Sequence, residues 1–333
     1  MKPTTARLAI GWFALVLLAP WFGWAARGWH ATAIDNRTPT ALPNLSPIRW
    51  LRPATWTQLS KSLDDHLPGR DQAIRARTQL DDRVFGDSSN PQVLKGSDGW
   101  LFTADSLNLA CYRSREPADL DRVAGRLDEV IPGRVSVLLV PDKLLAVPSL
   151  AHGAISSGCD AGARTAIRNA RGPDSRILDT WSAFDVAHPQ DLWWPQDSHL
   201  NGNGEALLVR QIVGQLAAVM TIDPAGQAEM DLPPLLGRRV TATGPTLTVT
   251  RTATDPRIEP RTVIIHDSQL TRLTSHLSPF YRDVTFIEYE DLGDFPPRSS
   301  LDAIRTAEVV IIETVERQAY QRLTDRLVSF LAS

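Results

Sequence analysis

The chain has 333 residues, which is enough for one large domain or two modest ones. Its composition is that of an ordinary globular protein, with 43% hydrophobic and 22% charged residues. A formal net charge of −3 provides no basic field for nucleic acid, so we exclude nucleic acid as a partner.

An uncharged apolar stretch occupies Leu8–Ala26. At about 1.5 Å per residue it is just long enough to span a hydrocarbon core of roughly 30 Å. Lys2 and Arg7 precede it, and this basic flank favours a cytoplasmic N-terminus with the following chain exported. The bulky Trp24 near its end argues against a cleaved signal peptide. We therefore expect residues 1–27 to be an uncleaved signal anchor in the inner membrane. A soluble periplasmic protein after signal cleavage is the alternative.

Export also bears on the two cysteines, Cys111 and Cys159. In an oxidising compartment an even number of cysteines indicates a disulfide. No CxxC pattern occurs and neither cysteine has a histidine at ligand spacing, which argues against a thiolate metal site. We expect one disulfide between them.

The next segments lead away from the membrane. Residues 28–55 are rich in proline and threonine, as is typical of a linker. Residues 56–85 carry apolar side chains near helical spacing, with a break at Pro68-Gly69.

From there to the C-terminus the pattern is α/β. Short apolar runs alternate with helical patterns, which predicts a parallel sheet with helices on both faces. The expected strands are 134–141, 176–181, 261–268, 284–289 and 307–315, and the expected helices are 119–131 and 204–220. Alternating threonine and valine between 233 and 259 predict a small antiparallel β insertion. We assign 56–333 to this single domain.

In such sheets ligands bind at the carboxyl ends of the strands. Lys143, Ser268 and Glu313 follow or end three of the expected strands. A serine at a strand end is a candidate nucleophile if a general base lies within reach and an acid orients that base. Asp197 and His199, two residues apart in one loop, provide such a pair. Taken separately, each feature has a simpler explanation: a polar surface loop for the pair, and a helix N-cap for the serine.

Several motifs together resemble one family, the alginate O-acetyltransferases of the AlgJ and AlgX type, which are SGNH-hydrolase-like proteins of exopolysaccharide acetylation. The motifs stand in the family's order over most of the chain: "LDDHLPGRD" (63–71), "VFGDSSNPQVLKGSDGWLF" (84–102), "LLVPDK" (138–143), "WWPQDSHLNGNGEA" (193–206), "VIIHDSQL" (263–270) and "AEVVIIETVER" (307–317).

The resemblance implies an SGNH-hydrolase-like, flavodoxin-like sheet and a Ser268–His199–Asp197 triad. It also places Cys111 and Cys159 where such proteins carry a disulfide. The chain departs from the family pattern at three other positions: His266 replaces a glycine, Gln269 an aromatic residue and Leu200 a tryptophan. These changes leave the triad intact but bear on the oxyanion site, because a side chain at position 266 crowds the turn if the backbone needs a positive φ.

The activity implied is acetyl transfer to hydroxyls of an exported polysaccharide through an acetyl-serine. A polytopic membrane O-acyltransferase would supply the acetyl group, since no coenzyme A pool is expected outside the cell. Candidate sugar contacts are Lys143, Trp194 and Asn201, although Lys143 equally suits a structural cap and Trp194 the core. No phosphate-loop, dinucleotide, calcium or zinc-protease motif occurs, so we expect no cofactor and no metal. The alternatives are an acetyl esterase with the same triad and a non-catalytic glycan-binding subunit of an export complex.

Overall fold

A computed structural model describes the following residues: 3–28, 39–44, 46, 50, 52–85, 88, 90–107, 125, 126, 129, 131, 134–151, 176–178, 180–186, 188–214, 218–251, 257–292 and 297–323. Cys111 and Cys159 lie outside them, as does most of the helix expected at 119–131. The chain divides into two compact units. The first comprises Met1–Asn90 with Pro233–Val240, and the second Pro91–Leu232 with Thr241–Ser333.

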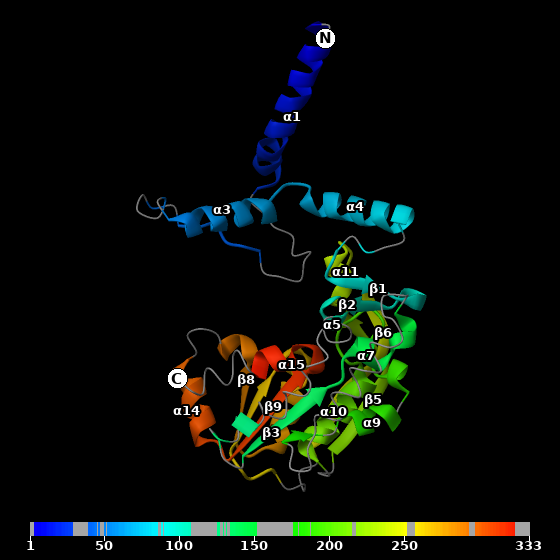
Figure 1. Cartoon of the computed structure of the whole chain (residues 1–333), viewed down its shortest axis with the longest axis vertical. Helices are drawn as coiled ribbons and strands as arrows, with labels where there is room; N and C mark the ends of the chain where they lie inside the picture. Colours follow the sequence, from blue (N-terminus) through cyan, green and yellow to red (C-terminus); the bar gives the residue numbers. More distant parts are fainter. Residues whose placement is uncertain are drawn as a thin grey trace. The chain divides into compact units, whose positions relative to one another are not determined.

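The first unit is mainly helical (Figure 1). Its helices are α1 (Pro3–Arg27), α3 (Pro53–Asp65) and α4 (Arg70–Phe85). The break between α3 and α4 falls at Pro68-Gly69 as expected, and α3 begins three residues earlier than expected, inside the presumed linker. Pro53 suits that start because proline has no amide hydrogen to leave unpaired in a first turn. Within the described part of the chain, no helix combines the length and hydrophobicity that a membrane crossing requires, so the expected membrane helix is not confirmed.

A five-stranded parallel sheet forms the centre of the second unit. Its order is β4 (Ile177–Leu178), β3 (Val135–Val140), β9 (Val309–Val315), β7 (Thr262–His266), β8 (Val284–Glu288). Every neighbouring pair is parallel. The mixed α/β class and the parallel sheet agree with the sequence analysis. Because β3, β9 and β7 are adjacent, the residues that follow them gather at one edge of the sheet (Figure 1).

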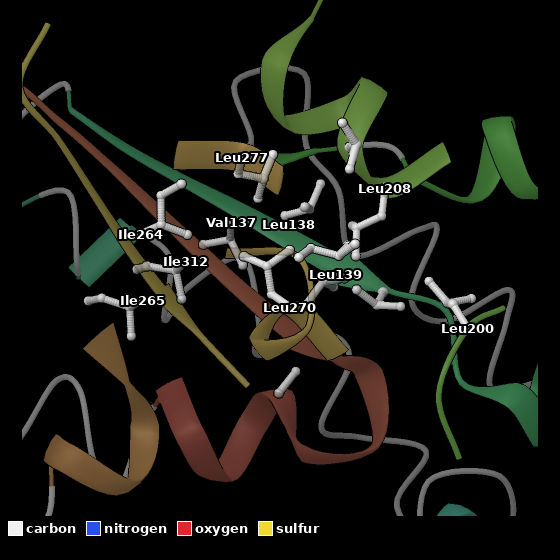
Figure 2. Packing of buried hydrophobic residues seen from close by; sticks show 14 of the residues in the cluster. Val137, Leu138, Leu139, Leu200, Leu208, Ile264, Ile265, Leu270, Leu277 and Ile312 are labelled. Atoms are coloured by element: carbon white, nitrogen blue, oxygen red, sulfur yellow. The ribbon is translucent and has the colours of Figure 1, made fainter. Parts of the chain in front are cut away.

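The inner strands β3, β9 and β7 are largely buried because both faces of the sheet are covered. All five residues of β7 are buried, which explains its uninterrupted apolar run. Three leucines, Leu208, Leu270 and Leu277, bring helices onto the strands: α10 (Gly202–Val213), α12 (Ser268–Thr271) and α13 (Thr274–Leu277). Figure 2 shows these leucines within the buried cluster that also contains Val137, Leu138, Leu139, Ile264, Ile265 and Ile312.

The remaining helices are short, and several begin directly at strand ends. They are α5 (Asp105–Leu107), α7 (Lys143–Ala146), α9 (Trp181–Val186), α10 (Gly202–Val213), α11 (Leu232–Leu235), α12 (Ser268–Thr271), α13 (Thr274–Leu277), α14 (Arg298–Thr306) and α15 (Glu316–Gln321). The 3-10 helices are η1 (Ser97–Gly99), η3 (Pro148–Leu150), η4 (Pro189–Asp191), η5 (Ser278–Phe280) and η6 (Tyr289–Leu292).

Two antiparallel hairpins accompany the sheet: β1 (Val93–Lys95) with β2 (Leu101–Thr103), and β5 (Ala218–Glu229) with β6 (Thr241–Arg251). The second is longer than the expected insertion at 233–259, and the helix expected at 204–220 is shorter. Gly214, with φ of 66°, ends α10, and the apolar residues from Ala218 on pair with β6 instead. An apolar run of this length fits either structure, and the pairing with β6 decides between them.

Candidate active site

Asp197 and His199 lie in a short loop that is closed at its base. Trp193 and Leu200 form an antiparallel bridge across it. Asn201 caps α10, because its side-chain oxygen accepts from Asn203 N at 2.9 Å and Gly204 N at 3.3 Å. The loop therefore leaves a tight bridge and enters a capped helix, so the residues between them have little freedom.

The tight loop brings the aspartate onto the histidine. Asp197 Oδ1 accepts the His199 backbone N–H at 2.8 Å and lies 2.6 Å from His199 Nδ1. Asp197 is fully buried, whereas the His199 side chain keeps 13% of its surface exposed. With Nδ1–H donating to the carboxylate, Nε2 is the nitrogen left to accept a proton. This is the arrangement of an oriented general base.

A second carboxylate also faces the histidine. Asp231 Oδ2 lies 3.3 Å from His199 Nδ1, and Asp231 accepts both the N–H of Ser198, at 2.8 Å, and its hydroxyl. Burial disfavours a charge on the ring, but the hydrogen bonds and charges of Asp197 and Asp231 outweigh burial and raise the pKa of His199 to about 9. Burial likewise opposes the charge of Asp231, yet the contacts with His199 and Ser198 hold its pKa well below the usual range.

Sequence reasoning missed Asp231. It stands between β5 and α11, 33 residues after Ser198 in the chain, next to no motif. A single aspartate at the end of a hairpin strand is typical of a solvated turn, so nothing in the local sequence distinguishes it.

Ser268 is the first residue of α12 and its side chain is exposed. Asp267, buried, caps this helix: its Oδ1 accepts Gln269 N at 2.8 Å, and its Oδ2 accepts Val315 N at 2.8 Å. The turn is therefore anchored to the end of β9. Because the backbone N–H of Gln269 already donates to Asp267 in this cap, it is not free to bind an oxyanion. No hydrogen bond joins the described residues Ser268 and His199, so the triad stays a prediction.

Gln269 connects the serine turn to the histidine loop. Its side-chain Nε2 donates to Ser198 O at 2.9 Å, and its Oε1 accepts Leu200 N at 3.2 Å. These backbone groups flank His199 on both sides. One buried side chain, adjacent in sequence to Ser268, therefore ties together the two segments that carry the candidate nucleophile and base.

Several solved structures are similar to this chain. No protein-family model and no curated protein matches the sequence. The chain is similar to the O-acetyltransferase domain of Pseudomonas putida AlgJ, with 16% identity and a TM-score of 0.44 over 68% of this chain and 92% of that one. It is similar to Pseudomonas aeruginosa AlgX at 14% identity and a TM-score of 0.42, over 74% of this chain and 68% of that one.

The family that the motifs resemble is among these structures. A further similarity is to Bacillus cereus PatB1 with a sulfonyl adduct, at 11% identity and a TM-score of 0.48, over 72% of this chain and 99% of that one. Because these identities and TM-scores are low, we take no activity, substrate or site residue from the likenesses.

Lys143 anchors the loop that carries His199 through hydrogen bonds to backbone carbonyls. Its ammonium donates to the carbonyl oxygens of Leu101, Trp194, Pro195 and Asp197 at 2.8–2.9 Å, and it is 3% exposed. A lysine has three donors, so none remains for a ligand. Burial lowers its pKa to about 7, against the opposing charges of Asp197, Asp231 and Asp142.

The other two candidate sugar contacts are also engaged. Trp194 is 3% exposed and lies against β6, where a Cβ on Gly244 would come within 2.7 Å of its ring. Asn201 is 5% exposed and uses both ends of its amide within the loop. A role of these residues in binding sugar has no support from their positions.

His266, the replacement for the family's glycine, is buried and packs edge-on to Phe286 at 6.0 Å. Among the described residues, Asp98 is the only non-glycine residue with a positive φ, so position 266 needs no special backbone. The side chain of His266 therefore meets no positive-φ strain at the turn before Ser268.

Asp197, His199 and Asp231 offer ligand atoms within 4.8 Å of one another, close enough for a cation. His199 presents Nδ1 to both carboxylates, which is the arrangement of a hydrogen-bonded imidazole rather than of a metal ligand. We assign no metal to this group.

Proposed function

We propose that this protein is an O-acetyltransferase that moves acetyl groups onto hydroxyls of an exported polysaccharide. The observation that carries the proposal is the Gln269 bridge. It ties an exposed serine at the end of a buried strand to a loop in which an aspartate orients a histidine.

The mechanism would have two steps with one covalent intermediate. Ser268 Oγ attacks the carbonyl carbon of the acetyl donor, and its proton passes to Nε2 of His199. The leaving group takes that proton as the bond to the acetyl carbon breaks, leaving acetyl-serine. A sugar hydroxyl then attacks, gives its proton to His199, and Ser268 leaves with the proton returned. Asp197 stabilises the imidazolium in both steps.

The two segments are tied together, but no hydrogen bond joins Ser268 to His199 among the described residues. Catalytic hydrogen bonds are often long in the free enzyme and tighten in the complex, so this geometry is compatible with the mechanism. The exposed Ser268 leaves room for a bulky acceptor such as a polysaccharide.

The acceptor, the donor and the location rest on the sequence. The motif resemblance supports a polysaccharide acceptor and a polytopic membrane O-acyltransferase as the acetyl source. The uncharged stretch Leu8–Ala26 after two basic residues supports anchoring in the inner membrane with the site in the periplasm. Cys111 and Cys159 fit an oxidising compartment.

The test uses the full chain, a chromogenic acetyl ester and a panel of neutral and uronate oligosaccharides, with products identified by mass. Acetylated oligosaccharide is the expected product, and Ser268→Ala should form none. Release of acetate alone in the presence of every acceptor would identify an esterase. Equal turnover by the wild type and Ser268→Ala would overturn both readings.

A further inference from the structure

We propose that Asp231 is a second positioning carboxylate for His199, and that it sets the pH at which this histidine can act as a base. The inference deepens the proposed function and rests on it where catalysis is concerned. The geometry behind it is independent of the substrate.

Asp231 cannot swing away from the histidine. Its Oδ1 accepts Ser198 N at 2.8 Å, its Oδ2 accepts the Ser198 hydroxyl, and its own N–H donates to Asp197 Oδ2 at 3.1 Å. These three contacts fix both the backbone and the carboxylate. Asp231 Oδ2 therefore stays 3.3 Å from His199 Nδ1, and the imidazole faces two carboxylates at the same nitrogen.

Arg272 and Lys143 also act on the two carboxylates, but neither forms an ion pair with Asp231 among the described residues. Arg272, 40% exposed, lies 3.5 Å from Asp197 Oδ2 and offsets that aspartate in part. In the part of the chain that the structure describes, His199 is the only ion-pair partner of Asp231. An imidazolium is thus the one cation that meets the charge of Asp231 directly.

Other titratable groups face this cluster from the neighbouring elements. Glu205, in the first turn of α10, has a pKa that burial raises to about 7, against the opposing charges of Arg272 and His199. Lys143 of α7 lies below the loop and acts on Asp197 and Asp231 through its charge. Neither Glu205 nor Lys143 forms a hydrogen bond or an ion pair with His199 among the described contacts. Of the groups considered outside the loop, Asp231 is therefore the one that contacts the imidazole directly.

The consequence is a base that is switched on by rising pH. A histidine with a pKa of about 9 is about 99% protonated near pH 7, and only the neutral ring accepts a proton from serine. Asp197 and Asp231 together therefore keep His199 protonated in most molecules at neutral pH. Removing its charge should leave more neutral histidine at neutral pH, at the cost of weaker support for the imidazolium during the reaction.

The experiment is an NMR titration of the histidine ring signals in the full chain. The chain has seven histidines, and the signal missing from His199→Gln assigns the resonance. In the wild type we expect the His199 midpoint at about 9. In Asp231→Asn the midpoint should fall by about 1–3 pH units, the usual effect of one adjacent charge.

Glu205→Gln is the matched control, because it removes a carboxyl group near the cluster that forms no hydrogen bond or ion pair with His199 among the described residues. It should move the midpoint by much less than Asp231→Asn does. A wild-type midpoint close to that of free histidine would overturn the proposal, and this measurement holds even where Asp231→Asn fails to fold. An unchanged midpoint in a folded Asp231→Asn would overturn it as well.

Acetyl ester turnover separates this inference from the proposed function. If both hold, the rise of kcat/KM with pH moves to lower pH in Asp231→Asn by the same amount as the NMR midpoint. A shifted midpoint in a chain without any ester turnover would overturn the proposed function and leave Asp231 as the residue that sets the protonation of His199.

Discussion

Replacement of Gln269 by methionine tests the link between the serine turn and the histidine loop. Methionine has a similar length and flexibility, so it fills the same space without either hydrogen bond. The Ser198 carbonyl and the Leu200 amide then lose their partner in a buried site, since Gln269 is 4% exposed and Leu200 1%.

The magnitude follows from those two lost contacts. A buried backbone group without a partner costs about 1–3 kcal/mol, so losing two partners in Gln269→Met should lower the free energy of unfolding by roughly 2–6 kcal/mol. The kcat/KM of the folded variant should also fall, because the loss of this link can displace the nucleophile from the base. A displacement of about 1 Å between nucleophile and base is enough to cost about 100-fold in rate.

The assay pairs urea unfolding with kcat/KM for a chromogenic acetyl ester. Gln227→Met is the control, because it makes the same substitution at an exposed position of β5. We expect wild-type stability and turnover from the control. A folded Gln269→Met with wild-type stability and turnover within about twofold would refute the idea that this side chain holds the two segments in register.

Four further predictions concern the triad, the pH profile, the disulfide and the anchor. Ser268→Ala and His199→Ala should each abolish ester turnover, and Asp197→Ala should cost less; residual activity in Ser268→Ala equal to the wild type would contradict the triad. Because the neutral base is required and the pKa of His199 is about 9, kcat/KM of the wild type should rise about 50-fold from about pH 7 to about pH 9, and a flat profile would contradict the assignment. Alkylation without reductant should label neither Cys111 nor Cys159 in the exported protein, and labelling of both would remove the disulfide. The native chain should fractionate with membranes at full mass in high salt; a mature soluble form lacking the apolar N-terminal stretch would overturn the anchor.

The parallel strands were predictable from the sequence because each is a short apolar run that contains valine or isoleucine. β3, β7, β8 and β9 all lie within the ranges expected for them. Burial on both faces of the sheet requires such runs, so the local composition reports the environment directly. The prediction was least accurate for the edge strand β4, which has two residues where six were expected.

The Asp197–His199 contact was also within reach of the sequence. The two residues are two positions apart in a turn, and an aspartate in such a turn accepts from the backbone N–H two residues on. The side-chain pairing then needs only the ring to rotate onto the same carboxylate. Local geometry is therefore enough to bring this pair together.

Only the tertiary structure supplied Asp231 and Gln269. Asp231 meets Ser198 across 33 residues and Gln269 meets it across 71, through segments that are far apart in the chain. The start of β5 at Ala218 was likewise decided by tertiary structure. Its apolar run is compatible with a helix, and pairing with β6 makes it a strand. Contacts of this kind depend on where whole strands and helices pack. The sequence near each residue carries no record of the partner, so the second carboxylate and the bridge emerge only when the chain is folded.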